Sequence, residues 1–139
     1  MLEGRSAEGG AGGEARNGFP GGGVVLAPKS EGDLDVLISS AGDWWVFVEF
    51  CAEWSGTSVA MQGAFECLAR EHPEVAFLRL DVSRFPETAS RHGATRVPTY
   101  AAFWKGLKEA EFAGASERKL RETLDRCLQL GPASRWSAE

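Results

Sequence analysis

The sequence predicts an α/β domain in which a central mixed β-sheet is flanked by helices. Short apolar strands first alternate with amphipathic helices, a pattern typical of parallel strands joined by crossover helices. Two consecutive strands and a helix then close the chain, which favours an antiparallel hairpin. The composition agrees, since 139 residues with 43% hydrophobic and 25% charged side chains are ordinary for one globular domain. The predicted order is β-α-β-α-β-α-β-β-α.

The first elements follow from short runs of apolar residues. Residues 24–26 are a β-branched run that suits an edge strand. Ser30 is expected to cap a short helix whose apolar residues are spaced for one face, namely Leu34, Leu37 and Ile38. Residues 45–50 are almost continuously apolar, which is typical of a central strand covered on both faces. Glu49 is the one charged residue in that run.

A long helix and a second central strand follow. Residues 58–71 predict a helix that ends before Pro73, since proline cannot continue a helix. Its apolar residues recur at i, i+3, i+4, i+7 and i+8, which predicts one buried stripe of Met61, Ala64, Phe65, Leu68 and Ala69. Residues 75–82 are a second apolar strand, and residues 87–92 a short helix ended by Gly93.

The last part predicts a hairpin and a final helix. Residues 99–104 and 108–113 are two strands separated by a turn at Lys105-Gly106. Ser116 is expected to cap the last helix, which Gly131-Pro132 ends. The side chains predicted to face inward from this helix are Leu120, Leu124, Cys127 and Leu128.

Both ends of the chain differ in amino-acid composition from this domain. Nine of the 17 glycines lie in residues 1–23, a segment with almost no large apolar side chains. Such a segment cannot bury enough surface to offset its ordering entropy, so we expect a disordered tail. It also lacks the apolar core of a signal peptide and carries acidic residues that a transit peptide avoids. The predicted domain therefore spans residues 24–130, with a second tail at 131–139.

Charge and cysteine content exclude several classes of protein. A net charge of -5 argues against a protein that binds nucleic acid through its phosphates. No run is long and apolar enough for a transmembrane helix, so we expect no membrane insertion. Cys51, Cys67 and Cys127 form no Cys-x-x-Cys pair and have no metal-ligand spacing, so we expect no metal site and no cofactor. Unpaired cysteines favour a reducing compartment, and we expect a cytoplasmic protein.

Local motifs limit the α/β folds that the sequence could adopt. Ala52-Glu53-Trp54 follows the first central strand and precedes the helix, Val97-Pro98-Thr99 begins a later strand, and Gly114 lies before the last helix. In these motifs, in this order, the chain resembles the thioredoxin family over roughly residues 24–130. The resemblance implies the thioredoxin fold and a dithiol active site between Trp54 and the helix.

The sequence departs from the family at that active site. Thioredoxins carry Trp-Cys-Gly-Pro-Cys, whereas this chain has Ser55, Gly56, Thr57 and Ser58 after Trp54. The family's chemistry needs a thiolate that attacks a disulfide and a second cysteine that resolves the mixed disulfide. A serine hydroxyl has too high a pKa to exchange with a disulfide. We call residues 55–58 the slot. No disulfide reductase activity is expected from the slot, and no residue is assigned as catalytic.

Other chemistry at the slot is not supported either. A serine nucleophile needs a base within hydrogen-bond reach, and the resemblance puts His72 and His92 at helix ends away from Ser55. Ser55 and Ser58 are good residues for a helix start. Glu49 matches the buried acid that the family places behind the second cysteine. With serine at position 58 it has no thiol proton to accept, and we expect a buried carboxyl that is partly protonated.

The resemblance also implies a surface that could bind a peptide. Pro98 matches the family's cis proline, which exposes the backbone of Val97 to an extended substrate. That role needs no sulfur, so a groove could persist, formed by Trp54, Gly56, Thr57, Val97, Pro98 and Gly114. The alternative is that Pro98 only shapes the entry to its strand. Trp44, Trp54 and Trp136, near element ends, could also meet a partner, whereas Trp44 and Trp45 cannot share a face of one strand.

Two functions remain open. The first is a redox-inactive thioredoxin-like protein that acts as a protein-binding or structural module, with an unidentified protein partner, within a larger assembly. The second is a thiol-disulfide oxidoreductase whose active-site cysteines were replaced by serine. Thr57, Cys51 and Gly63 also depart from the family, at positions where an engineered inactivation would need no change. These departures favour natural divergence and the first function.

Overall fold

The computed structural model describes residues 22–132. The two predicted tails, 1–23 and 131–139, fall almost wholly outside these residues, as does Trp136. Within the described range the predicted order of nine elements is confirmed, with one five-stranded mixed sheet.

The sheet has the strand order β1-β3-β2-β4-β5. Its strands are β1 (Val25–Leu26), β2 (Trp45–Cys51), β3 (Val75–Asp81), β4 (Thr99–Trp104) and β5 (Leu107–Ala113). The first three are parallel, whereas β4 is antiparallel to β2 and β5 is antiparallel to β4. The apolar strands β2 and β3 lie at the centre, as continuous apolar runs predict for strands covered on both faces.

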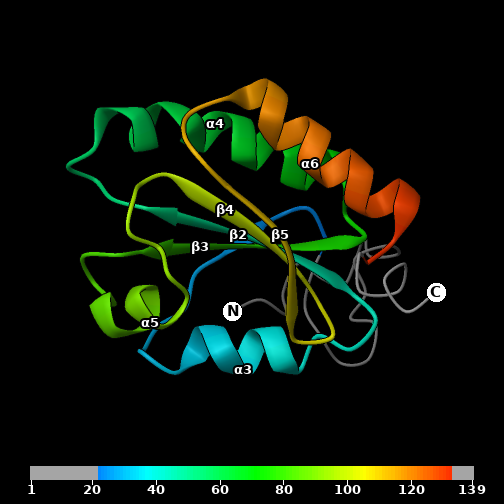
Figure 1. The fold of residues 1–139 in the computed structure, drawn as a ribbon, viewed down its shortest axis with the longest axis horizontal. Helices are drawn as coiled ribbons and strands as arrows, with labels where there is room; N and C mark the ends of the chain where they lie inside the picture. Colours follow the sequence, from blue (N-terminus) through cyan, green and yellow to red (C-terminus); the bar gives the residue numbers. More distant parts are fainter. Residues whose placement is uncertain (1–21, 133–139) are drawn as a thin grey trace.

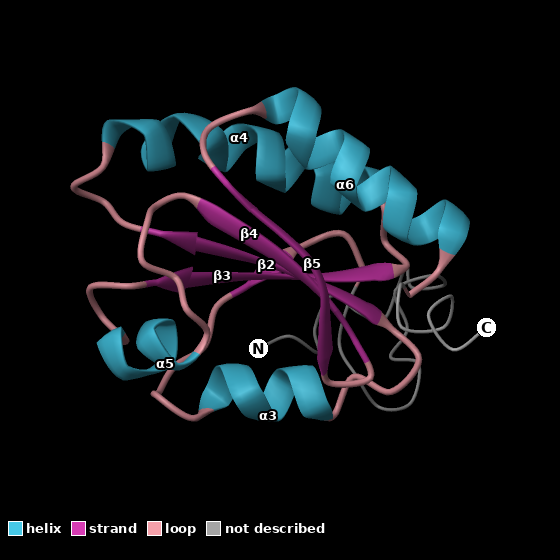
Figure 2. Cartoon of the chain, in the orientation of Figure 1, coloured by secondary structure: helices cyan, strands magenta, loops and turns pink. Residues whose placement is uncertain are grey.

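Helices cover both faces of the sheet (Figures 1 and 2). On one face lie α3 (Asp33–Ser39) and α5 (Pro86–Arg91), and on the other lie α4 (Gly56–Glu71) and α6 (Glu117–Leu130). The apolar stripe predicted for α4 is confirmed, because Met61, Phe65, Leu68 and Ala69 are buried and Ala64 is partly buried against the same core. Ser116 caps α6 as predicted, its hydroxyl oxygen accepting a hydrogen bond from the Lys119 N–H at 3.1 Å.

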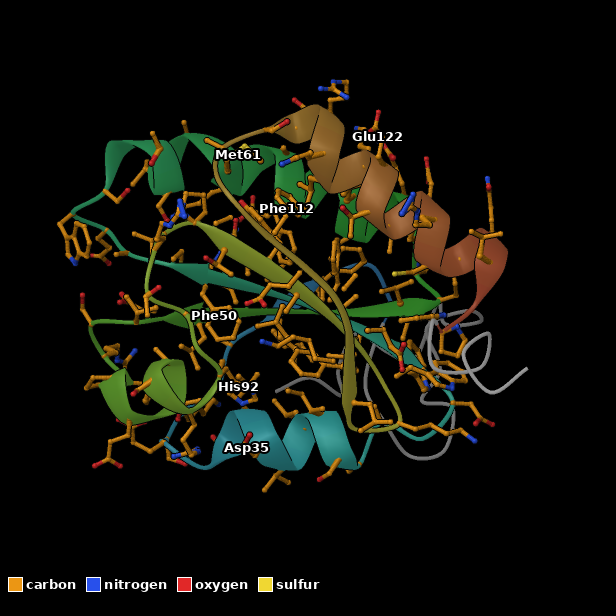
Figure 3. All side chains as sticks on the ribbon, viewed as in Figure 1. Asp35, Phe50, Met61, His92, Phe112 and Glu122 are labelled. Carbon is orange, nitrogen blue, oxygen red and sulfur yellow. The ribbon has the colours of Figure 1, made fainter. Side chains whose placement is uncertain are left out.

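The sheet separates two hydrophobic cores. Trp44 and Phe50 belong to the core under α3 and α5, whereas Trp45 packs against the core under α4 and α6. Figure 3 shows Phe50 on the side of the first core and Met61 on the side of the second. Successive strand side chains point to opposite faces, so the two adjacent tryptophans diverge as predicted.

Two predictions about these elements are wrong. Ser30 does not cap α3: the Asp33 carboxylate turns back and accepts hydrogen bonds from the Ser30 hydroxyl at 2.8 Å and the Lys29 N–H at 2.7 Å. The helix begins after Gly32 instead, without a side-chain cap. Trp44 is not available to a partner, since its ring is buried in the core beneath α3.

Candidate functional site

The topology brings four connections to one end of the sheet. Because β4 runs antiparallel to β2, Thr99 at its start pairs with Phe50 near the end of β2. Thr99 also pairs with Ala113 at the end of β5, and Cys51 pairs with Asp81 at the end of β3. The segments after β2, β3 and β5 and the segment before β4 therefore meet, at the left of the sheet in Figure 1. All the predicted slot and groove residues lie at this end except the strand residue Glu49.

The two serines of the slot act in the start of α4. Ser55 is the N-cap, and its hydroxyl oxygen accepts a hydrogen bond from the Ser58 N–H at 3.3 Å. A further hydrogen bond of 3.1 Å joins the Ser55 and Thr57 hydroxyls. Ser58 is fully buried, and its Oγ accepts a hydrogen bond from the Ala52 N–H at 3.0 Å. Both hydroxyls thus satisfy backbone groups at the junction of β2 and α4.

Glu49 lies fully buried next to two polar partners. Its Oε1 accepts a hydrogen bond from Arg79 Nε at 2.6 Å, and its Oε2 accepts one from the Tyr100 hydroxyl at 2.8 Å. The same guanidinium contacts Glu66 Oε2 at 3.0 Å and the Gln62 carbonyl at 3.3 Å. Burial raises the pKa of the Glu49 carboxyl above its ordinary value, while Arg79 and Tyr100 oppose that shift. Burial also raises the pKa of Tyr100.

Sequence reasoning missed the two partners of Glu49. A signal was present for Arg79, because it is the one basic residue in the apolar run of β3 and pairs in register with Glu49. Tyr100 gave no comparable signal, since a tyrosine in a central strand is an ordinary core residue. Neither residue belonged to the predicted slot or groove.

Trp54 is the most exposed large aromatic ring at this end of the sheet. Its side chain is 71% exposed, and its indole Nε1–H donates a hydrogen bond to Ser83 Oγ at 2.7 Å. Ser83 follows β3, so this bond joins the connection after β2 to the connection after β3. The indole is therefore oriented although most of its surface faces solvent.

Pro98 follows a cis peptide bond with Val97. The Pro98 carbonyl accepts a hydrogen bond from the Gly114 N–H at 2.9 Å, which joins the start of β4 to the segment after β5. Gly114 has a φ of +117°, a conformation that favours glycine. Within residues 22–132, the N–H and C=O of Val97 make no hydrogen bond. Both backbone polar groups of Val97 thus lack a partner among the described residues.

None of the three cysteines stands at position 55 or 58, although Cys51 directly precedes Ala52, whose N–H bonds to Ser58. Cys51 is buried at the end of β2, where burial raises the pKa of its thiol to about 12. Cys127 lies on the buried face of α6, and burial raises the pKa of its thiol to about 11. Cys67 is half-buried on α4, and its Sγ lies 3.6 Å from Glu71 Oε2. None of the three forms a disulfide.

Neither of the two histidines lies next to Ser55. His72 ends α4 at the far end of that helix and contacts Glu74, while His92 ends α5 and contacts Asp35 at 2.8 Å. Figure 3 shows His92 and Asp35 together beside α3. In the part of the chain that the structure describes, no group of His, Cys, Asp or Glu side chains is arranged to hold a metal ion. Nor does any helix of that part have the length and apolar character to cross a bilayer.

Comparison with known proteins identifies the family. The family model described as Thioredoxin matches residues 28–126. Thioredoxin of Oryctolagus cuniculus is 32% identical over 105 residues, which are 76% of this chain and 100% of the relative. The chain belongs to the thioredoxin family. The structure of Fasciola hepatica thioredoxin is similar to it with a TM-score of 0.70 and 35% identity, covering 73% of this chain and 97% of that one. Thioredoxin F from spinach chloroplast has a TM-score of 0.72 and 28% identity, covering 78% and 96% respectively.

Family membership allows the slot to be compared with the active-site segment of thioredoxins. Ser55 and Ser58, which the sequence resemblance matches to the family's two cysteines, lie before and within the first turn of α4. Gly56 and Thr57 lie between them, in the first turn of α4. The start of α4 thus carries hydroxyls at both of the matched positions, those of Ser55 and Ser58.

Proposed function

We propose that this protein is a redox-inactive thioredoxin-like module that binds a protein partner at the end of the sheet around Trp54 and Pro98. The observation that carries the proposal is the bonding of the slot serines. Ser55 caps α4 and the buried Ser58 accepts the Ala52 N–H, so both hydroxyls serve the backbone. Disulfide exchange needs two sulfurs here, and neither position supplies one.

Binding is supported by the neighbouring surface. A ring that is 71% exposed and fixed by one hydrogen bond loses little conformational entropy when a partner covers it. The unbonded N–H and C=O of Val97 can pair with an extended segment by strand addition. Gly56, Thr57 and Gly114 offer little side-chain bulk beside it. The proposal needs no cofactor, and it takes residues 24–130 as the domain that carries the surface.

Insulin reduction tests the redox part. The protein should show no turnover above background, with or without alkylation of its three cysteines. The matched variant is Ser55→Cys with Ser58→Cys, which returns two thiols to the start of α4, where the helix N-terminus stabilises a thiolate. That variant should reduce insulin. Turnover by the alkylated original protein would overturn the proposal.

Partner recovery tests the binding part. Trp54→Ala should lower recovery of a partner from an extract by about tenfold or more, as removal of a central contact does. Pro98 is buried, so Pro98→Ala should lower recovery by altering the backbone of Val97 instead. Leu107→Ala is the matched control, because Leu107 is 59% exposed at the opposite end of β5. Equal recovery by all three variants would show that partners use another face.

A second candidate is an oxidoreductase that was inactivated by replacement of both cysteines. The buried Glu49 favours it, since an acid behind the second position has a use in dithiol chemistry. Cysteine codons at positions 55 and 58 in the gene would establish this alternative. Serine codons would leave the binding module as the function.

A further inference from the structure

Three apolar side chains form a row across the sheet at the end opposite the slot. Trp45 at the start of β2 pairs in register with Trp104 at the end of β4, and Trp104 pairs with Leu107 at the start of β5. Side chains of residues paired in register point to the same face of a sheet. Trp45 packs against the core under α4 and α6, so the row lies on that face. We call these three residues the far-end row.

The described part of the chain covers the far-end row only in part. The ring centroids of Trp45 and Trp104 lie 5.2 Å apart and both residues are half-buried, while Leu107 is 59% exposed. Lys105 borders the row, with its Nζ 5.9 Å from the centre of the Trp104 ring and 3.5 Å from Asp43 Oδ1. Contiguous apolar side chains at a surface mark a contact site, whereas single ones are ordinary.

The end of α6 brings the chain back to this part of the fold. The helix follows the slot end of β5 and runs toward the far end of the sheet (Figure 1). Cys127 and Leu128, in its last turn, pack in the same core as Trp45. Gly131 then turns the chain with a φ of +79°, and Pro132 is buried. A buried residue just past the helix end means that the chain returns to the domain at Pro132 instead of running straight into solvent.

One large apolar side chain follows Pro132 in the sequence, that of Trp136. It is four residues further on, and four extended residues span about 13 Å. We infer that segment 133–139 binds to the far end of its own domain, with the Trp136 indole packed on the far-end row. A third ring can extend an aromatic pair through edge or offset contacts, and the exposed Leu107 side chain is then removed from water.

This contact is separate from the proposed function, because the far-end row and the slot lie at opposite ends of the sheet. It gives a role to Trp136, which the proposed function does not use. An apolar row that is covered by the chain itself is closed to other proteins. Partner binding is then left to the surface around Trp54.

Indole NMR of the full chain tests the contact. The reference is a synthetic peptide of residues 131–139, whose Trp136 indole is in water. In the full chain the Trp136 indole signal should differ from that of the peptide and should show NOEs to the rings of the far-end row. Trp136→Ala should shift both indole signals of the row and leave the Trp54 signal in place. Ser137→Ala, the matched control, should leave the row signals unchanged.

A charge in the row and the oligomeric state distinguish the possible occupants. Leu107→Asp should release the segment, so that the Trp136 indole takes the chemical shift of the peptide while the Trp54 signal reports an intact fold. Sedimentation velocity should show a monomer at all concentrations. A dimer that Trp136→Ala dissociates would show that the segment binds a second copy, and would overturn the inference. A Trp136 signal equal to that of the peptide in the original chain would also overturn it and leave the row to another protein.

Discussion

Arg79 forms an ion pair with the fully buried Glu49, with its Nε 2.6 Å from Oε1. The pair joins β2 to β3 at matched register positions, and the guanidinium reaches onward to α4 through Glu66. A buried carboxylate is costly unless it is paired and hydrogen-bonded. Arg79 and Tyr100 together fill that need, which explains why the strand tolerates an acid at its centre.

Removing Arg79 should destabilise the fold more than neutralising the Glu49 carboxylate. Arg79→Met leaves Glu49 without its cation, and we expect the free energy of unfolding to fall by about 3 kcal/mol. Glu49→Gln keeps the hydrogen bond to Tyr100 and removes the buried charge, so it should cost less. Urea unfolding of both variants and of the double variant measures the coupling. Additive effects would show that the two side chains act independently.

The serines at the start of α4 should stabilise the fold by different amounts. Ser55→Ala removes the N-cap, which should lower the free energy of unfolding by about 1 kcal/mol. Ser58→Ala leaves the Ala52 N–H without its acceptor in a fully buried place, which should cost about 2 kcal/mol. Thr57→Ala is the control, because its hydroxyl contacts only that of Ser55. Urea unfolding should show the largest loss for Ser58→Ala, a smaller one for Ser55→Ala and the smallest for Thr57→Ala.

Gly63 lies in the middle of α4, on its exposed side. A Cβ added there would meet no atom within 4 Å. Alanine is favoured over glycine inside a helix, so Gly63→Ala should raise the free energy of unfolding by about 1 kcal/mol. Gly114→Ala is the contrasting variant, since its φ of +117° is strained for any other residue. A gain in stability at Gly114, or a loss at Gly63, would contradict the expectation.

Much of this fold could be predicted from short-range patterns. Apolar spacing located the buried stripe of α4, and the continuous apolar run located β2, because both patterns depend on residues close in sequence. The start of α3 could not be predicted in this way. Serine is a common capping residue, which is why Ser30 was expected to cap the helix. Its hydroxyl instead donates to the Asp33 carboxylate, and the residue types alone do not distinguish these two bonds.

Long-range contacts limited what could be predicted about the site. The partners of Glu49 come from β3 and β4, 30 and 51 residues further along the chain. The Ser83 contact that orients Trp54 spans 29 residues. Residues of this kind meet through strand order and register, which no local pattern specifies. The sequence therefore placed Trp54, Ser55 and Pro98 by family resemblance and left their supporting residues unnamed.

Glu71 should make stability depend on pH. Its hydrogen bond from Arg121, which joins α4 to α6, lowers the pKa of Glu71 below its ordinary 4.5, and its slight burial opposes the shift. A lowered folded pKa contributes stability that is present above about pH 4.5 and is lost as the pH falls through the folded pKa. Thermal unfolding should therefore show Glu71→Gln to be less stable than the original at pH 7 and similar to it at pH 3. In an Arg121→Gln background this difference should be small at both pH values.

The three thiols should differ in reactivity within the folded protein. Alkylation requires a thiolate that the reagent can reach, and Cys51 and Cys127 are buried with pKa values raised to about 12 and about 11. Cys67 is half-buried on α4 and is the thiol that solvent reaches best. Maleimide at pH 8 should therefore label Cys67 first in the native protein, and mass spectrometry of peptides identifies the site.

Cys67→Ser should leave a folded protein that reacts slowly with maleimide until urea exposes the other two thiols. This comparison also bears on the redox proposal, because Cys51 ends the strand that leads to the slot. If Cys51 reacted as fast in the native protein as in urea, a reactive thiol would lie near Ser55, which would count against the redox-inactive proposal. Slow labelling of Cys51 in the native protein would instead support a binding surface without thiol chemistry at this end of the sheet.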